Sequence, residues 1–557
     1  MVAFSPSRFL PPEGSRARFW ALTLLCFAPF AFGLLALALG QDANWDLRNY
    51  HYYNAYAFLN NRYAQDLLPS QTPYFYNPLM DVPFFVLAQF ASARAVGFFL
   101  GFVQGFNFIL LFWIAYAALT LQSPKRKVIV CAALALLGML GGGGIAQIGT
   151  TFGDNITSLG ALLSAALVIG FWDKLSSAPI RKALFLALFF GVPAGLMMGL
   201  KLPAVIYAVG LCGGLLFAGG DWKRGFVLSF AFGLGVLLGC AVTLGPWMVF
   251  LQTHFGSPLF PYFNDIFKSP LAPLTSARDI QYAPHSTSDY FTMPFLFAHS
   301  SFRVGEIELR DWRIPILYVL LPLAVLLRLF LNRNRTLESS ATPQATRYLL
   351  ASFSLAYVVW LVMFSIYRYA VTLEMITPLL IVLAAGLLPF KMKTRTITAI
   401  LLLLIVAVSV KPGNWNRRDT WLDRFVEAGV PNLGNTSDLM ILMTGMEPYS
   451  HVIPEFPPDV SFVRIQSNFS SPEQDKGINK LLHDRVDAHR QKGGSFMVMT
   501  PIWQMKGAED AVSYFGLKIA NKEYLLIGAK VMKKDCLNVD DKLFNNGTLT
   551  VCHLIPK

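Results

Sequence analysis

A short polar segment directly after the first long apolar run carries the side chains best suited to chemistry. Asp42, Asp46, Arg48 and His51 place two carboxylates, a guanidinium and an imidazole close together among aromatic residues. Ionisable groups at the edge of a membrane are costly to hold unless they find partners or perform a task. Two interpretations stay open at this point. The segment is a catalytic centre at the membrane boundary, or it is an interfacial anchor with aromatic rings at headgroup level and charges in water.

Two further polar residues stand where apolar runs are interrupted. Asp154 opens an apolar run behind a row of glycines, and Lys201 stands between two apolar runs. Asp154 could cap a helix by accepting hydrogen bonds from exposed backbone amides. Lys201 could extend its long side chain to the membrane surface, but its place in a broken apolar stretch suits a lipid phosphate better. We therefore expect Lys201 to bind phosphate, and both roles of Asp154 stay open.

Arg368 and Glu374 flank another turn between apolar runs, and His254 lies in a long polar loop, residues 251–312. Arg368 and Glu374 could form a structural ion pair, although a guanidinium is also suited to binding an anionic group. Neither His254 nor His51 identifies a site by itself, because a single histidine is more often a structural hydrogen-bonding group.

The composition indicates a membrane protein built from many helices. The chain has 557 residues, of which 54% are hydrophobic and 14% charged, with a mean hydropathy of +0.48. A soluble chain normally carries about a quarter charged residues. Apolar runs of about 20 residues, long enough to cross a bilayer, recur between residues 19 and 410.

The net charge of +13 does not indicate a nucleic-acid-binding protein, because the basic residues gather in short gaps between apolar runs. Such clusters are typical of cytoplasmic loops. They are Arg16, Arg18, Lys125, Arg126, Lys127, Arg181, Lys182, Lys223, Arg224, Arg333, Arg335, Lys391, Lys393 and Arg395.

Alternation across the membrane then predicts about eleven spans, with the N-terminus in the cytoplasm and the C-terminus outside it. A short interfacial helix is expected at 80–93. The predicted spans are 19–40, 95–121, 128–147, 155–172, 183–200, 203–219, 225–250, 313–331, 347–367, 372–390 and 396–410.

The composition changes at residue 411, which predicts a membrane domain over 1–410 and a small extracytoplasmic α/β domain over 411–557. Short buried strands are expected at 439–443, 461–465 and 495–499, and helices at 472–491 and 506–515. Cys536 and Cys552 could pair across a hairpin in an oxidising compartment. The localisation that follows is the inner membrane, with the C-terminal domain in the periplasm.

The layout resembles the glycosyltransferase-C superfamily, in the branch that holds protein O-mannosyltransferases and lipid A aminoarabinose transferases. The likeness covers roughly residues 19–260 and rests on short elements in a common order. These elements are Asp46-Leu-Arg-Asn-Tyr50, Tyr74-Phe-Tyr-Asn-Pro-Leu79, Gly153-Asp154, Gly199-Leu-Lys201-Leu-Pro203 and Gly245-Pro-Trp247.

The sequence departs from the pattern of this branch in two places. Leu47 follows Asp46 where the branch often has an Asp-Glu pair, so Asp42 could supply the second carboxylate. The usual Pro-Pro pair is Asn77-Pro78 here. These changes bear on the identity of the sugar and the acceptor more than on the class of reaction.

The resemblance implies transfer of a sugar from a polyprenyl-phosphate donor to an acceptor hydroxyl outside the cytoplasm, with inversion. The acceptor is a glycan, a lipid or a protein. Asp46 is the expected base, with Asp42 as its rival. Lys201 and Arg368 are expected to bind the phosphate leaving group. Asp154 would support the acceptor or join Asp46 in holding a divalent cation, Mg²⁺ or Mn²⁺.

The remaining candidates for substrate binding come from the same face of the membrane, and we expect them to gather with the acidic residues at one pocket. Aromatic members would stack on the sugar, although residues of an interfacial belt look the same in sequence. The remaining candidates are Arg48, Tyr50, His51, Tyr74, Tyr76, Asn77, His254 and Glu374.

Two other classes of membrane protein stay open. An O-antigen ligase or polymerase-like enzyme would place its key Arg and His residues in one large loop late in the chain, whereas here the polar cluster follows the first span. A transporter usually holds charges at the bilayer midplane and shows internal repeats. Neither feature is visible in this sequence.

Overall fold

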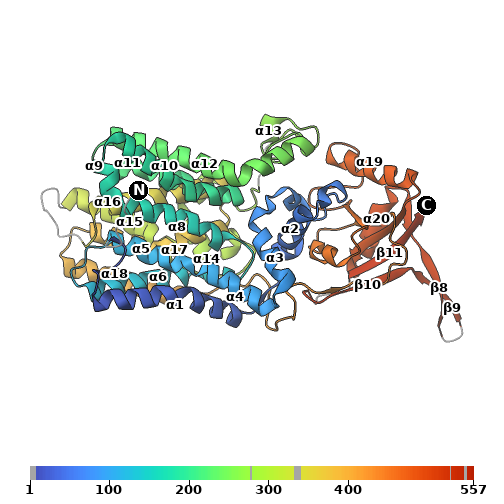
Figure 1. Ribbon diagram of the computed structural model, residues 1–557, viewed down its shortest axis with the longest axis horizontal. Helices are drawn as coiled ribbons and strands as arrows, with labels where there is room; N and C mark the ends of the chain where they lie inside the picture. The colour runs from blue at the N-terminus through green and yellow to red at the C-terminus, as the bar shows by residue number, and fades with distance from the viewer. Residues whose placement is uncertain (1–7, 276–278, 332–339, 527–528, 545–548) are drawn as a thin grey trace. The chain divides into compact units, whose positions relative to one another are not determined.

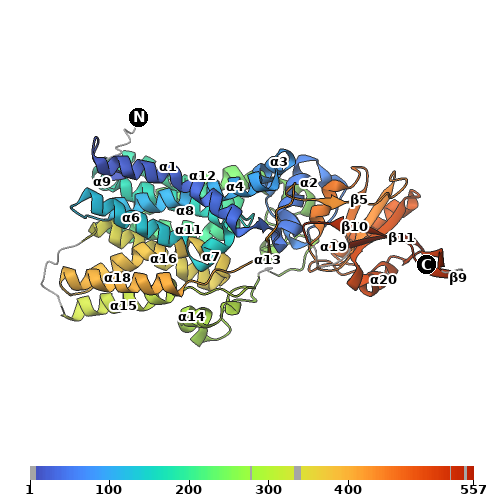
Figure 2. The same cartoon turned by 90° about the horizontal axis from the view of Figure 1, so that it is seen from below.

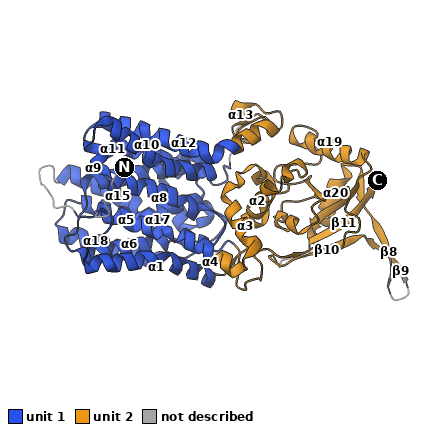
Figure 3. Ribbon diagram, in the orientation of Figure 1, with its two compact units in different colours: residues 1–39, 98–246, 279–415 blue, residues 40–97, 247–278, 416–557 orange. Residues whose placement is uncertain are grey.

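The computed structural model describes residues 8–275, 279–331, 340–526, 529–544 and 549–557, and it is mostly helical, at 63%. The chain forms two compact units, coloured separately in Figure 3. Unit 1 comprises Met1–Leu39, Phe98–Pro246 and Asp279–Trp415. Unit 2 comprises Gly40–Gly97, Trp247–Arg278 and Asn416–Lys557.

Long helices that run side by side make up most of unit 1 (Figures 1 and 2). The helices that lie wholly or mostly in unit 1 are α1 (Arg16–Leu39), α4 (Ala93–Gln104), α5 (Phe106–Ala118), α6 (Pro124–Met139), α7 (Gly142–Gln147), α8 (Asp154–Gly170), α9 (Trp172–Ser177), α10 (Ile180–Leu200), α11 (Val205–Ala218), α12 (Trp222–Phe255), α14 (Thr287–His299), α15 (Arg313–Leu331), α16 (Pro343–Met363), α17 (Val371–Leu387) and α18 (Met392–Ser409).

Eight helices among the described residues are long and apolar enough to cross a membrane, which makes this a multi-pass membrane protein by length and composition. The other three predicted spans correspond to α6, α8 and α11, which have 16, 17 and 14 residues. Outer helices such as α15 and α18 expose most of their apolar side chains, whereas α17 is largely buried within unit 1. A surface of this kind suits lipid rather than water. Arg333 and Arg335, assigned above to a cytoplasmic gap, lie outside the described residues.

Glycines bring α10 and α12 into close contact. Gly191 and Gly195 of α10 lie against the backbone of α12, and Gly235 and Gly239 of α12 lie against the backbone of α10. A Cβ atom added at Gly195 would collide with the carbonyl of Val236. Small residues spaced four apart allow membrane helices to approach in this way. The two helices are therefore held together mainly by backbone-to-backbone packing.

Unit 2 is built around a seven-stranded sheet in the order β3-β10-β11-β6-β4-β5, with β7 pairing β11. Strand β4 is parallel to β5 and β6, and β11 runs antiparallel to β6 and β10. The strands are β3 (Ala428–Gly429), β4 (Leu439–Met443), β5 (Ser461–Arg464), β6 (Ser495–Pro501), β7 (Leu517–Ile519), β10 (Cys536–Asp541) and β11 (Leu549–Pro556).

The predicted strands and helices of the C-terminal region are confirmed, within a residue or two for the strands. Helix α20 (Met505–Ser513) lies within two residues of the predicted 506–515, whereas α19 (Ile478–Gln491) begins six residues later than the predicted 472–491. Cys536 and Cys552 face each other in the β10–β11 hairpin and form a disulfide. Two further strand pairs lie outside this sheet: β8 (Asn521–Leu526) with β9 (Ala529–Lys534), and β1 (Gln41–Asp42) with β2 (Arg417–Arg418).

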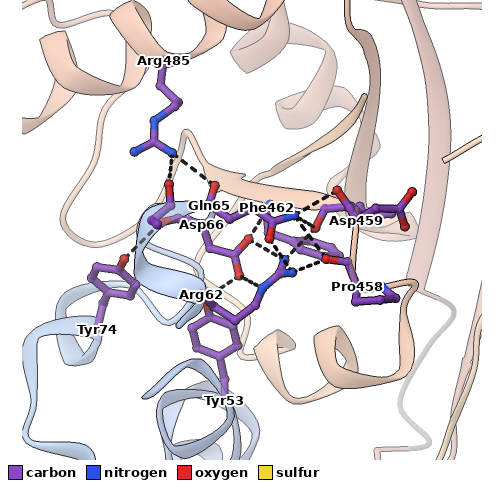
Figure 4. A network of polar contacts seen from close by, with 11 residues as sticks. Tyr53, Arg62, Gln65, Asp66, Tyr74, Pro458, Asp459, Phe462 and Arg485 are labelled. Carbon is purple, nitrogen blue, oxygen red and sulfur yellow. Dashed lines mark hydrogen bonds and ion pairs between the residues drawn. The ribbon is translucent and has the colours of Figure 1, made fainter. Parts of the chain in front are cut away.

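The C-terminal sheet does not stand alone, because residues 40–97 belong to the same compact unit. Leu67 forms a parallel bridge with Val463 beside β5. Asp66 accepts hydrogen bonds from the Arg62 guanidinium, the Tyr53 hydroxyl and the backbone amide of Phe462 (Figure 4). A buried carboxylate with this many donors is fully satisfied. The segment after the first span is thus anchored on the last domain of the chain.

Candidate functional site

The first polar segment folds as a π-helical turn, η2 (Leu47–His51), which continues into α2 (Tyr52–Leu59). Turns of this kind are rare and occur frequently at functional sites. Asp46 stands at the start of the turn, and its Oδ2 accepts a hydrogen bond from the Tyr50 hydroxyl at 3.1 Å. The turn therefore gathers Asp46, Arg48, Tyr50 and His51, the residues singled out in the sequence, in unit 2.

The two candidate bases of this segment differ in their surroundings. Asp42 lies in β1 (Gln41–Asp42) and is 0% exposed, and its Oδ1 accepts from the backbone amide of Asn44 at 3.1 Å and from its side-chain amide at 2.7 Å. Asp46 is 9% exposed. A general base has to reach the proton that it removes. The geometry favours Asp46 over Asp42.

Three tyrosines form an aromatic group next to Asp46. The ring of Tyr76 meets the edge of Tyr50 with centroids 5.4 Å apart, and it stacks on Tyr262. The hydroxyls of Tyr76 and Tyr262 are 3.1 Å apart. Tyr76 is 36% exposed, so this group reaches the surface of unit 2. Aromatic faces of this kind can stack against a sugar ring.

Three other predicted binding residues have structural contacts instead. Tyr74 is buried, and its hydroxyl donates to the carbonyl of Asp66. The Asn77 side chain caps a short helical turn by accepting from the amide of Leu79. His254 is exposed and hydrogen-bonds through Nδ1 to the carbonyl of Phe250 at the end of α12.

Arg48 is buried in unit 2. Its Nε donates to the carbonyl of Ala43, and its guanidinium lies 3.6 Å from the centre of the Phe544 ring. Burial lowers the pKa of Arg48 to about 10, against the opposing effect of the Asp541, Glu447 and Asp42 carboxylates. These contacts fix the π-helical turn on the C-terminal domain.

His51 has a partner that the sequence analysis missed. Its Nδ1 lies 2.7 Å from Oδ1 of Asp81, and both side chains are buried. In the part of the chain that the structure describes, Nε2 of His51 has no hydrogen-bond partner. Asp81 stands two residues after the aromatic-Pro-Leu element, Tyr74–Leu79, and this short distance from a candidate element was the available signal.

In unit 1, Asp154 and Lys201 are brought together. Gly153, with a φ of 80°, takes the cap position of α8, so Asp154 is the first helical residue and not the cap. Helix α10 ends at Leu200, which leaves Lys201 in an extended conformation. Its Nζ lies 2.7 Å from Oδ1 of Asp154 and donates to the carbonyl of Phe152 at 2.6 Å.

A small hollow, with a cavity volume of about 10 Å³, lies beside Asp154. Its lining is polar where Asp154, Thr157 and Thr372 contribute. Oδ2 of Asp154 is buried and has no hydrogen-bond partner among the described residues. One carboxylate oxygen thus binds Lys201, and the other is available to a ligand. The hollow is lined by Asp154, Thr157, Pro203, Ala204, Tyr207, Tyr369, Val371 and Thr372.

Arg368 approaches the same region of unit 1. Its guanidinium lies 4.5 Å from the centre of the Phe152 ring, while the carbonyl of Phe152 binds Lys201. Two cations therefore meet around one residue. A lone phosphate group would be attracted to both.

Glu374 is buried and binds the glycine run. Its carboxylate accepts from the amides of Gly143 and Gly144 at 3.0 and 2.7 Å and from the Tyr367 hydroxyl at 2.8 Å. A Cβ atom added at Gly141 would collide with this carboxylate, which explains the glycines. The ion pair with Arg368 considered above is not among these contacts.

The acidic candidates fall into different units: Asp42 and Asp46 in unit 2, Asp154 in unit 1. Among the described residues, no group of three His, Cys, Asp or Glu side chains is arranged to hold a metal ion. The Mg²⁺ or Mn²⁺ site at Asp46 and Asp154, and the single pocket that gathers all the candidates, stay predictions.

Comparison with protein-family models, with curated proteins and with solved structures found no match for the chain.

Proposed function

We propose that the chain is an integral membrane glycosyltransferase of the glycosyltransferase-C type, with about eleven spans. It moves a sugar from a polyprenyl-phosphate donor to a hydroxyl outside the cytoplasm, by inverting displacement. The observation that carries the proposal is the Asp154–Lys201 pair, 2.7 Å apart, beside a hollow in the unit that holds the membrane helices. Ionisable groups in such a place are retained for function.

Lys201 and Arg368 bind the phosphate of the donor. The polyprenyl tail needs an apolar environment, and the exposed apolar helices of unit 1 are suited to a bilayer. As the bond to the sugar breaks, negative charge grows on the phosphate, and nearby cations stabilise it. Lys201 supplies a compact charge and Arg368 a planar fork. Phe152 contacts both side chains, which supports a shared role.

Asp46 removes the proton of the acceptor hydroxyl as the hydroxyl attacks the anomeric carbon. The proton passes to the carboxylate, and the C–O bond to the phosphate breaks, so that the phosphate leaves with the bonding electrons. Tyr50 holds one oxygen of Asp46 through its hydroxyl. The aromatic group of Tyr50, Tyr76 and Tyr262 supports a sugar-sized ligand in the same unit.

The disulfide between Cys536 and Cys552 supports an extracytoplasmic position for the C-terminal domain, because such bonds persist in oxidising compartments. Together with the basic gaps, this favours the inner membrane, a cytoplasmic N-terminus and a periplasmic C-terminal domain.

The test is sugar transfer by the purified chain in lipid, given a radiolabelled polyprenyl-phosphate hexose or pentose and a membrane lipid extract. We expect label to leave the donor and appear in a new product. Counterflow of the intact donor across vesicles, without cleavage of the sugar–phosphate bond, would replace the proposal with a transporter.

A further inference from the structure

We infer that His51, held by Asp81, recognises a hydroxyl of the transferred sugar. The inference rests on the proposed function for the class of ligand, but the site itself comes from the geometry of unit 2. In this proposal Asp81 orients the His51 ring, and Nε2 of His51 accepts a hydrogen bond from the sugar hydroxyl.

The contact between His51 and Asp81 fixes the proton on the ring. The Asp81 carboxylate accepts a hydrogen bond, so the proton of a neutral imidazole lies on Nδ1, 2.7 Å from Oδ1 of Asp81. Nε2 then carries a lone pair. A carboxylate that orients a histidine in this way is typical of rings whose second nitrogen contacts a metal or a substrate.

Nε2 is the unusual atom of this pair. His51 is 1% exposed, and Nε2 has no hydrogen-bond partner within the described ranges. A buried polar atom without a partner costs stability, so its retention calls for a purpose. The atom can accept a hydrogen bond from a ligand that brings a donor group, such as a hydroxyl.

A hydroxyl fits the surroundings better than a metal ion. A metal would need further ligands, and the described residues offer no cluster of three His, Cys, Asp or Glu side chains. The neighbours are aromatic instead. Tyr50 packs on His51 with centroids 4.1 Å apart, and Tyr76 packs on Tyr50. A polar acceptor beside aromatic faces and the Asp46 carboxylate is suited to a sugar.

Nε2 is buried, so access to it requires a movement of the side chains around it. Tyr76 is partly exposed and contacts Tyr50, so a shift of these two rings is the movement that we expect on binding.

A second buried His–Asp pair in unit 2 provides the matched control. His451 contacts the carbonyl of Arg48 through Nδ1 at 3.0 Å and the Asp541 carboxylate through Nε2 at 3.1 Å. Both ring nitrogens face oxygen atoms, so neither is left for a ligand. The same chemical change in the two pairs therefore has different expected results.

The experiment is a binding cycle on the full chain in lipid nanodiscs, with a short-chain polyprenyl-phosphate hexose and its monodeoxy analogues as probes. In the unchanged protein, one deoxy analogue should bind about 10- to 100-fold more weakly than the parent, the usual range for losing a hydrogen bond to a buried acceptor. His51→Leu should weaken binding of the parent by a similar factor. The variant should then bind the parent and that deoxy analogue with equal affinity.

Three further variants sharpen the result. His51→Gln places an amide oxygen near the position of Nε2 and should restore part of the affinity. Asp81→Asn allows the other tautomer, with the proton on Nε2, and should weaken binding. Asp541→Asn should leave the dissociation constant unchanged.

The outcomes separate the two proposals. Equal binding of the parent and every deoxy analogue by the unchanged protein overturns the role of His51, and this arm needs no mutation. Equal loss in Asp81→Asn and Asp541→Asn also overturns it, since both would then act through stability. If the deoxy analogues are distinguished as expected but no sugar is transferred, the proposed transferase function is wrong and the sugar-binding role of His51 stands. If no probe binds, both the proposed transferase function and the role of His51 are wrong.

Discussion

The ammonium group of Lys201 lies 2.7 Å from Oδ1 of Asp154, and both side chains are largely withdrawn from solvent. A charge pair in such a place depends on both members, because removal of one leaves the other uncompensated. A phosphate that binds Lys201 would compete with Asp154 for the same ammonium group. This relationship leads to the first prediction.

Lys201→Ala should raise the KM for the polyprenyl-phosphate donor about 10- to 100-fold, since a hydrogen bond to a charged group contributes about 1.5–3 kcal/mol. Donor-saturation kinetics measures the change, and Lys223→Ala, on an exposed residue at the start of α12, is the control. An unchanged donor KM accompanied by loss of folded protein would return Lys201 to a structural role.

Asp46→Asn should lower kcat by about 10²- to 10⁴-fold, the usual contribution of a general base. Its melting temperature should stay close to that of the unchanged protein, because the asparagine oxygen can still accept from Tyr50. Asp42→Ala should behave in the opposite way and lower the melting temperature, because the buried side-chain amide of Asn44 loses its acceptor. Full activity in Asp46→Asn would mean that the base is another residue.

Asp541 gives a prediction about pH. Burial tends to raise the pKa of its carboxyl, but the positive charge and hydrogen bond of His451 and the amides of Leu543 and Phe544 outweigh burial and hold the pKa below its ordinary value. A carboxyl with a lowered pKa stabilises the fold above its unfolded-state pKa, and the contribution is lost as pH falls through the folded-state pKa.

Asp541→Asn should therefore be less stable than the unchanged protein at pH 7, by about 1–3 kcal/mol. The gap should close as the pH falls below about 3.8, the ordinary value for aspartate. Chemical unfolding of the detergent-solubilised protein across this range is the measurement. A gap of constant size at every pH would show that the Asp541 charge contributes nothing.

The packing of α10 on α12 can be tested within one helix. Gly235→Ala should destabilise the protein by about 1–3 kcal/mol, because the new methyl group would collide with the carbonyl of Leu188. Gly245→Ala lies in the same helix and meets open space, so it should be neutral or slightly stabilising. Thermal unfolding of the pair in one detergent compares them directly, and equal melting temperatures would argue against close packing.

The orientation in the membrane predicts which residues are reachable from outside. On a background in which the exposed Cys26 is replaced, Lys492→Cys at the end of α19 should react with an impermeant maleimide added to intact spheroplasts. Lys125→Cys, in a basic gap, should react only after lysis. The reverse pattern would place the C-terminal domain in the cytoplasm.

Local features could be predicted from the sequence because their signals are local. Apolar runs with basic gaps located the helices of unit 1, and short, mostly apolar runs located β4, β5 and β6. The sequence analysis placed Asp154 and Lys201 on the same face of the membrane and expected them at one pocket, but it did not predict their direct ion pair. The π-helical turn was not predictable, since its residues do not differ in type from those of an ordinary helix.

The missed features depend on distant partners. The burial of Glu374 against the glycine run joins residues 230 positions apart, and the anchoring of Asp66 on Phe462 spans 396 positions. The composition changes at residue 411, but the boundary of the compact unit is not set by composition alone. Residues 40–97 belong to the same unit as the C-terminal sheet, and Leu67 is hydrogen-bonded to strand β5. The periodicity of apolar residues in the sequence does not indicate which distant residues will be in contact.

The anchoring of Asp66 on Phe462 has a consequence for synthesis. Asp66 leaves the ribosome early, and Phe462 follows 396 residues later. At a synthesis rate of about 5–20 residues per second, strand β5 is made roughly 20–80 s after the segment that holds Asp46 and His51. A nascent chain that stops before residue 462 lacks this contact, so Asp66 would be left without the backbone amide that strand β5 supplies.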